Sequence, residues 1–214
     1  MSSLFDIVVR AIVLLTTIPV HEAAHALAAE KMGDDTPRRA GRLTLNPLAH
    51  FDLLGTFSLL FLGIGWAKPV PINPSRFKNP KRGMALSAAA GPLSNLAMAW
   101  LALIPAKLCY YAPYSTVSET LYIIFINICL LNISLGIFNL MPFPPFDGGR
   151  IFSAFLPQRF YFQIMRYEKY ILVVVLALLW AGALQTPLHY LNNLLFTFLD
   201  LMTRWVDVIA RLVF

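Results

Sequence analysis

Residues 4–28 read LFDIVVRAIVLLTTIPVHEAAHALA, and this stretch decides the fold class. It is apolar over a length that matches the roughly 20 residues an α-helix needs to cross a bilayer. The whole chain has the same character, because 58% of its 214 residues are hydrophobic and only 13% are charged. A soluble domain carries roughly 25% charged residues. The sequence therefore predicts an integral membrane protein and excludes an ordinary soluble domain.

Four further apolar stretches are close to spanning length, namely 85–108, 119–141, 170–186 and 188–212. A shorter apolar run lies at 51–66. We expect an all-α polytopic membrane protein with about five to six membrane helices, folded as a single domain over 1–214.

The basic residues predict how the chain is oriented. Three segments, 31–50, 66–82 and 142–169, hold 13 of the 17 lysines and arginines, whereas 109–118 and 183–190 hold none. By the positive-inside rule the first three segments are cytoplasmic and the last two lie outside. This sorting, rather than nucleic-acid binding, explains the net charge of +6. We expect a multi-pass protein of the cell's inner (cytoplasmic) membrane with no nucleic-acid partner.

The same charge map constrains the short run at 51–66. Because 31–50 and 66–82 must lie on one side, the run between them cannot cross the membrane. We interpret it as part of a re-entrant or extended membrane-embedded segment near 43–75. The proline-rich stretch 65–74, GWAKPVPINP, is extended and is a candidate edge for holding an unwound substrate.

Two histidines and a glutamate stand inside the first apolar helix, in the pattern His21-Glu22-x-x-His25. Residues four apart share a helix face, so both imidazoles can bind one cation, and the adjacent glutamate can act on a water. Ionisable groups inside a membrane helix cost roughly 2.5 kcal/mol or more each and are usually functional. We interpret the trio as part of a metal site, in preference to a polar trio satisfied by neighbouring helices.

Residues 139–150, NLMPFPPFDGGR, offer a third ligand, which hydrolytic zinc sites typically need. The prolines end a helix and force an extended path that leads to Asp147. Alone, this is a proline-rich loop with an Asp-Gly turn; beside His21 and His25, a ligand is the better interpretation. The histidines lie roughly 9–15 Å below the cytoplasmic boundary, and Asp147 enters from the same side.

Three motifs occur in this order on separate membrane segments: HEAAH at 21–25, AGPLSN at 90–95 and NLMPFPPFDGG at 139–149. Together they resemble the site-2 protease family of intramembrane zinc metalloproteases. The stretches GDDTPRRAGRLTLNPLAHFDLLGT and GWAKPVPINP look like its short prokaryotic branch, without a PDZ or CBS domain. The resemblance implies hydrolysis of peptide bonds in or near transmembrane segments of membrane-protein substrates, that is, regulated intramembrane proteolysis.

Carried over by position, the resemblance makes His21, His25 and Asp147 the ligands of one Zn²⁺ per chain and Glu22 the general base. It implies a catalytic core over about 4–150, followed by C-terminal helices over 151–214. The implied partners are membrane-spanning protein substrates and the lipid bilayer, and the active site would open toward the cytoplasm. The oligomeric state is not indicated.

The resemblance also assigns roles to three further residues. Asn95 would line the site and help hold the substrate or the oxyanion, although helix–helix hydrogen bonding explains it equally well. Asn139 and Pro142 would shape the segment that carries Asp147.

The pair His50 and Asp52 has two interpretations. It is either a second metal site or gate, or a solvated loop pair, and we favour the loop pair.

The last helix carries a stripe of alternating charge at Asp200, Arg204, Asp207 and Arg211. An interfacial amphipathic helix with a solvated face is favoured over a charged seam against the bundle or a second protomer.

A different functional class remains open. Intramembrane histidines and aspartates also mark ion pathways, so a metal-binding membrane protein or transporter without protease activity is the alternative. Glu22 argues against it, because a pure binding site needs no general base.

Overall fold

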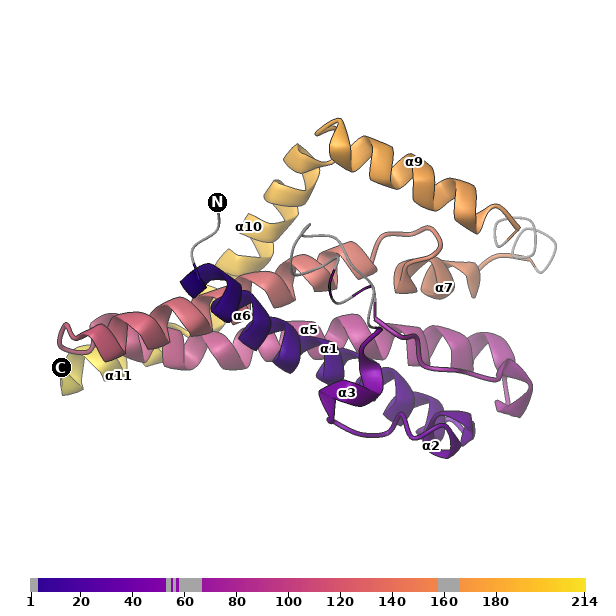
Figure 1. Cartoon of the computed structure of the whole chain (residues 1–214), viewed down its shortest axis with the longest axis horizontal. Helices are drawn as coiled ribbons and strands as arrows, with labels where there is room; N and C mark the ends of the chain where they lie inside the picture. The colour runs from indigo at the N-terminus through magenta and orange to yellow at the C-terminus, as the bar shows by residue number, and fades with distance from the viewer. Residues whose placement is uncertain (1–3, 53–54, 56, 58–66, 158–165) are drawn as a thin grey trace.

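The computed structural model describes residues 4–52, 55, 57, 67–157 and 166–214 (Figure 1). Within them every regular element is helical, and one isolated antiparallel bridge joins Phe51 to Ala67. The all-α membrane fold predicted from the sequence is confirmed. Most of the predicted re-entrant run at 51–66 lies outside the described residues.

Three helices are long and apolar enough to cross a membrane: α1 (Leu4–Lys31), α5 (Pro80–Tyr111) and α6 (Thr116–Asn139). Two more, α9 (Glu168–Trp180) and α10 (Gln185–Met202), meet at 85° and count as a fourth span only if they are taken together. The described residues therefore supply three or four spans, and the total of five to six remains a prediction.

The helix α5 is the centre of the molecule, because it contacts α1, α6 and α10 and also the two short helices α7 (Asp147–Ser153) and α11 (Arg204–Val213). The end of α1, the start of α5 and α7 lie toward one end of the molecule (Figure 1). The turn between α5 and α6 and the C-terminus lie at the other end. The short helix α2 (Thr36–Arg39), in the first segment predicted to be cytoplasmic, also lies toward the first end (Figure 1).

Capping residues in the local sequence determine where the helices begin. Asn79 caps α5 by accepting a hydrogen bond from the amide of Arg82, and Pro80 follows at the first helical position. Ser115 opens α6 with a reciprocal capping box to Ser118. These caps fix where the two central helices begin, and therefore which residues face each other across them.

The bundle core combines apolar side chains with one polar contact. Val13, Leu103 and Ile133 are among its buried members. Asn132 of α6 donates to the hydroxyl of Thr17 on α1 at 2.9 Å, and both side chains are fully buried. Such an interhelical hydrogen bond fixes the register of α1 against α6, four residues before His21.

Short elements connect α1 to α5: α2 (Thr36–Arg39), α3 (Pro47–His50) and the 3₁₀ turn η1 (Pro74–Arg76). Buried Asp34 accepts a hydrogen bond from the Asn73 amide at 2.6 Å, and Arg42 donates to the carbonyl of Lys68 at 3.2 Å. These contacts hold the extended residues 67–73 in place near α1.

His50 corrects one expectation. Its side chain is fully buried, with Nε2 bonded to the carbonyl of Thr44 at 2.8 Å, so it is not part of a solvated loop pair. Its own carbonyl accepts from the Lys68 amide at 2.9 Å. Among the described residues the structure groups no metal-ligand set around His50. His50 therefore links the loop at Thr44 to the extended segment at Lys68 through hydrogen bonds.

The C-terminal stripe also differs from the favoured interpretation. The predicted helix 188–212 is broken at Thr203 into α10 and α11. Asp200 and Asp207 do not form a purely solvated stripe, because both reach Lys107 of α5, at 2.8 and 2.7 Å, although Asp200 stays half exposed. The acidic half of the stripe is a charged seam against the bundle.

Candidate metal centre

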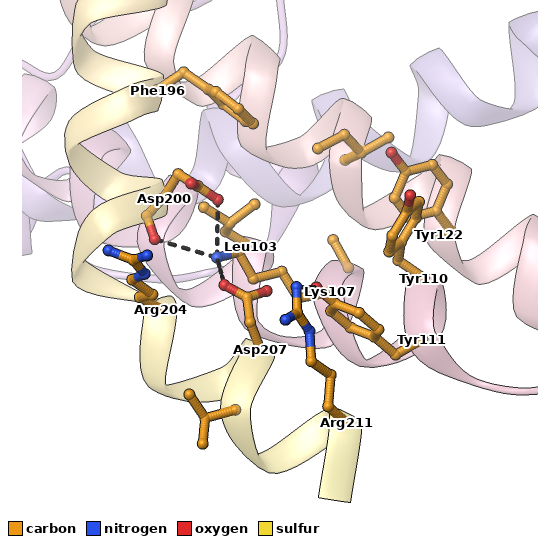
Figure 2. A pocket seen from close by; sticks show the side chains of 13 residues that line it. Leu103, Lys107, Tyr110, Tyr111, Tyr122, Phe196, Asp200, Arg204, Asp207 and Arg211 are labelled. Atoms are coloured by element: carbon orange, nitrogen blue, oxygen red, sulfur yellow. Dashed lines mark hydrogen bonds and ion pairs between the residues drawn. The ribbon is translucent and has the colours of Figure 1, made fainter. Parts of the chain in front are cut away.

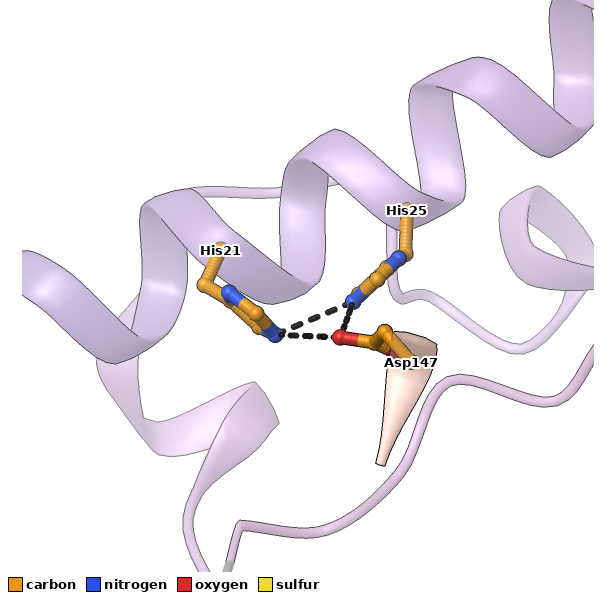
Figure 3. Close-up of side chains that lie close together, drawn as sticks. All are labelled: His21, His25 and Asp147. Carbon is orange, nitrogen blue, oxygen red and sulfur yellow. Dashed lines mark hydrogen bonds and ion pairs between the residues drawn. The ribbon is translucent and has the colours of Figure 1, made fainter. Parts of the chain in front are cut away.

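One face of α1 presents His21 and His25 together, as the four-residue spacing predicts. Their rings meet edge to face with centroids 4.6 Å apart, and their Nε2 atoms are 3.0 Å apart (Figure 3). Both side chains are nearly buried, with exposed fractions of 12% and 8%.

Asp147 is far from the histidines in the sequence and is the first residue of α7. Its Oδ2 atom lies 3.4 Å from Nε2 of His21 and 3.3 Å from Nε2 of His25 (Figure 3). The following residue has no room for a side chain, because a Cβ on Gly148 would lie 2.3 Å from the carbonyl oxygen of Leu140. Gly148 therefore lets the turn after α6 fold back closely enough to present the carboxylate.

The remaining ring nitrogens determine what the three atoms can bind. Nδ1 of His25 lies 2.7 Å from the carbonyl oxygen of Ser87, and Nδ1 of His21 lies 3.3 Å from Oδ1 of Asn95. Both partners are acceptors, so each Nδ1 carries the hydrogen. In the neutral tautomer each Nε2 then points its lone pair at the carboxylate of Asp147.

Three lone-pair atoms this close require a positive charge among them. Burial alone would raise the pKa of the Asp147 carboxyl, but hydrogen bonding to His21 and His25 holds that pKa well below its usual range. A divalent cation serves all three atoms at once. Ligands of a tetrahedral zinc at 2.0–2.1 Å stand about 3.3 Å apart, close to the three observed separations. The donor set and its spacing fit zinc.

Gly91 of α5 leaves the space that the imidazoles occupy. A Cβ there would lie 2.2 Å from Nε2 of His25 and 2.6 Å from Cε1 of His21. Because Ser87 lies one turn earlier on the same helix, α5 supplies both the room and the hydrogen-bond acceptor. The four-residue spacing of Ser87 and Gly91 is typical of close helix packing but does not by itself say which helix they face.

Glu22 lies beside the histidines at the junction of two cavities. One, of about 280 Å³, extends among apolar side chains of α1 and α6 and includes Glu22, His21 and Asn95 in its lining. The other, of about 430 Å³, is lined by Glu22, both histidines and Asp147, together with the segment 67–72. The first can receive an apolar chain and the second joins the candidate ligands to the end with the basic loops.

The other predicted residues lie at different distances from this centre. Asn95 is buried beside His21, and its Nδ2 atom has no hydrogen-bond partner among the described residues. Asn139 lines both cavities. Pro142 is exposed in the turn between α6 and α7. The substrate and oxyanion roles of Asn95, Asn139 and Pro142 remain predictions.

Comparisons with known proteins point to zinc metalloproteases. The model of peptidase family M50 matches residues 107–182, which include Asp147 but not the histidine pair. A Bacillus subtilis (strain 168) protein named "Putative zinc metalloprotease YwhC" is 39% identical over 173 residues, covering 78% of each chain. Zinc metalloprotease MJ0392 of Methanocaldococcus jannaschii is 27% identical over 149 residues, covering 70% of this chain and 34% of its own. No solved structure matches the chain.

The relatives and the donor chemistry of His21, His25 and Asp147 agree on the metal and on the class of enzyme. The chain is a membrane-type zinc metalloprotease, and it belongs to peptidase family M50, the site-2 protease family.

Proposed function

We propose that the protein is an intramembrane protease, in which His21, His25 and Asp147 hold one zinc ion and Glu22 is the general base. The observation that carries the proposal is the convergence of three metal-ligating atoms within 4.8 Å of one another, beside Glu22, with two of them on a helix long enough to span a membrane. We further propose that the chain is a single domain in the cytoplasmic membrane, with this centre opening toward the cytoplasm.

When bound, zinc supplies Lewis acidity, which makes water acidic enough to ionise near neutral pH and polarises the scissile carbonyl. The carboxylate of Glu22 accepts a proton from the attacking water as its oxygen bonds to the carbonyl carbon. The same carboxyl then donates that proton to the amide nitrogen as the carbon–nitrogen bond breaks. Asn95 orients His21 through Oδ1, and its Nδ2, which has no partner among the described residues, is left to donate to a substrate carbonyl.

The substrate must unwind before it can be cut, because a helical peptide bond is sheltered by its own hydrogen bonds. The extended segment 67–73 is suited to hold the unwound chain. Its residues Ala67, Val70 and Ile72 line the cavity of the candidate ligands, and the amides of Val70 and Ile72 make no hydrogen bond to another described residue. We propose that the substrate adds to this edge as a strand. Gly65 and Trp66, the start of the stretch predicted from the sequence, lie outside the described residues.

The test is cleavage of a single-span reporter by the full chain, reconstituted in vesicles with zinc. Glu22→Gln removes the proposed base and is expected to lower the cleavage rate by at least about 10³-fold, at the lower end of what general-base and proton-donor roles together contribute. Glu30→Gln is the matched control, since Glu30 lies two turns later on α1, pairs with Arg38, and should cleave like the wild type.

Equal cleavage by wild type and Glu22→Gln would rule out the proposed base. Zinc flux across the vesicle membrane without cleavage would instead support the transporter alternative. A metal chelator should abolish cleavage, and added zinc should restore it.

A further inference from the structure

A separate cavity, of about 480 Å³, lies between α5, α6, α10 and α11 (Figure 2). Lys107, which lines it, is 16 residues after Gly91 on α5, so about 24 Å along the helix from the candidate metal centre. This is the end of the molecule where α5 turns into α6 and where the chain ends (Figure 1). Nothing in the proposed hydrolysis uses it.

The ammonium group of Lys107 finds its hydrogen-bond acceptors within the protein. It donates to Oδ1 of Asp200 at 2.8 Å, to the Asp200 carbonyl at 3.1 Å and to Oδ2 of Asp207 at 2.7 Å. These contacts use the three hydrogens of the ammonium group. They also commit the two acidic side chains of the cavity to an internal cation, so neither is left to bind a ligand of its own.

Two guanidinium groups remain at the cavity. Arg204 makes no hydrogen bond or ion pair with any described residue, and it lines the cavity from the start of α11. Arg211, two turns later on the same face, has one hydrogen-bond partner in the described chain, the Tyr111 hydroxyl at 3.4 Å. Planar guanidinium groups bind phosphate through paired hydrogen bonds, which makes them suited to an oxyanion ligand.

Tyrosine hydroxyls add neutral donors to the same wall. Tyr110 and Tyr122 line the cavity with their rings 5.8 Å apart, and neither hydroxyl is hydrogen-bonded to a described residue (Figure 2). Tyrosines are typical of the depth where lipid headgroups meet the hydrocarbon. A ligand here therefore meets two cations and two hydroxyls at the membrane boundary.

The outer surface of α11 indicates where the ligand comes from. Beside the exposed Arg204 and Arg211 it carries exposed apolar side chains, among them Trp205, Val208 and Leu212, and Leu212 is 83% exposed. The helix thus exposes cations and apolar side chains next to one another, which suits the boundary between lipid headgroups and lipid tails. A molecule that enters from this side needs a charged head and an apolar body.

We propose that this cavity binds the phosphate group of an anionic phospholipid, with Arg204 and Arg211 on the phosphate and the hydroxyls of Tyr110 and Tyr122 on the headgroup. A purely structural role for the seam accounts for Lys107 and its two acidic partners, and Arg211 contacts Tyr111, but such a role gives no function to Arg204. The lipid would bridge α5 and α11 and complete the charge balance at that end of the bundle.

The test is lipid retention by the full chain in mild detergent, titrated with phosphatidylglycerol and followed by native mass spectrometry. The double variant Arg204→Gln/Arg211→Gln removes both guanidinium groups without touching the Lys107 cluster. Its matched control is Lys78→Gln/Arg82→Gln, which removes two exposed cations flanking the other end of α5. Phosphatidylcholine with the same acyl chains and inorganic phosphate are the competing probes.

Wild type and control should retain phosphatidylglycerol at least about ten-fold more tightly than the double variant, because charge-assisted hydrogen bonds are lost. Phosphatidylcholine should bind wild type at least about ten-fold more weakly than phosphatidylglycerol. Equal affinity in the double variant, or equal affinity for phosphatidylcholine, overturns the proposal. Displacement of the lipid by inorganic phosphate at the same concentration shows a free-anion site and overturns it too. No readout depends on proteolysis.

Discussion

Replacing Gly91 by alanine adds one methyl group at the point where α5 approaches the candidate ligands. The added Cβ would lie 2.2 Å from Nε2 of His25, and ordinary contact begins at about 3.4 Å. The imidazole must therefore retreat by about 1.2 Å. Zinc ligands tolerate departures of only about 0.2 Å, and an error of about 1 Å in catalytic geometry costs roughly 10²-fold in rate. We expect Gly91→Ala to lose most of its zinc and at least about 10²-fold in cleavage.

The control for this prediction is another glycine of the bundle. A Cβ on Gly136 of α6 would lie 3.2 Å from Cδ2 of Leu96, the end of a flexible side chain that can move away. Gly136→Ala should keep its zinc and most of its activity. Alanine also favours a helix over glycine by up to about 1 kcal/mol, so neither variant should lose helicity. Zinc is measured by elemental analysis and helicity by circular dichroism. Full zinc and wild-type cleavage in Gly91→Ala would refute the geometry described here.

Three further substitutions have defined outcomes. Asn95→Leu removes the acceptor that orients His21 and should weaken zinc binding by about 10–100-fold in chelator competition; unchanged affinity would contradict that role. Ser87→Ala should leave zinc affinity unchanged, because His25 uses the backbone carbonyl rather than the hydroxyl; a ten-fold loss would refute this. Lys107→Met leaves the carboxylates of Asp200 and Asp207 without their cation and should destabilise the fold by about 1–3 kcal/mol, since Asp200 is half exposed; this is seen as a lower unfolding temperature. An unchanged temperature would show that the seam contributes nothing.

Much of the candidate metal centre follows from local rules. The spacing of His21 and His25 places them on one helix face whatever the surroundings. The prolines before Asp147 ensure that the chain leaves the helix at that point. The charge map then gives both segments the same membrane side. These three arguments need no tertiary information, and the resemblance to a family supplies the roles.

The parts that local rules missed depend on contacts between distant segments. His50 sits in a polar loop, yet it is fully buried, because the extended segment at Lys68 covers it. Thr203 breaks the last helix without a glycine or proline, and the acidic residues on both sides of the break reach one lysine. That lysine, Lys107, is an ionisable group inside an apolar stretch, which is the one sequence signal that points to a buried partner here.

The most direct test of the zinc site is X-ray absorption at the zinc edge of the purified full chain. His21, His25 and Asp147 predict a first shell of two imidazole nitrogens and carboxylate or water oxygens at about 2.0–2.2 Å. The shell should contain no sulfur, and the zinc content should fall to near zero in Asp147→Ala. Sulfur ligands at about 2.3 Å, or full zinc occupancy in Asp147→Ala with an unchanged spectrum, would contradict the account.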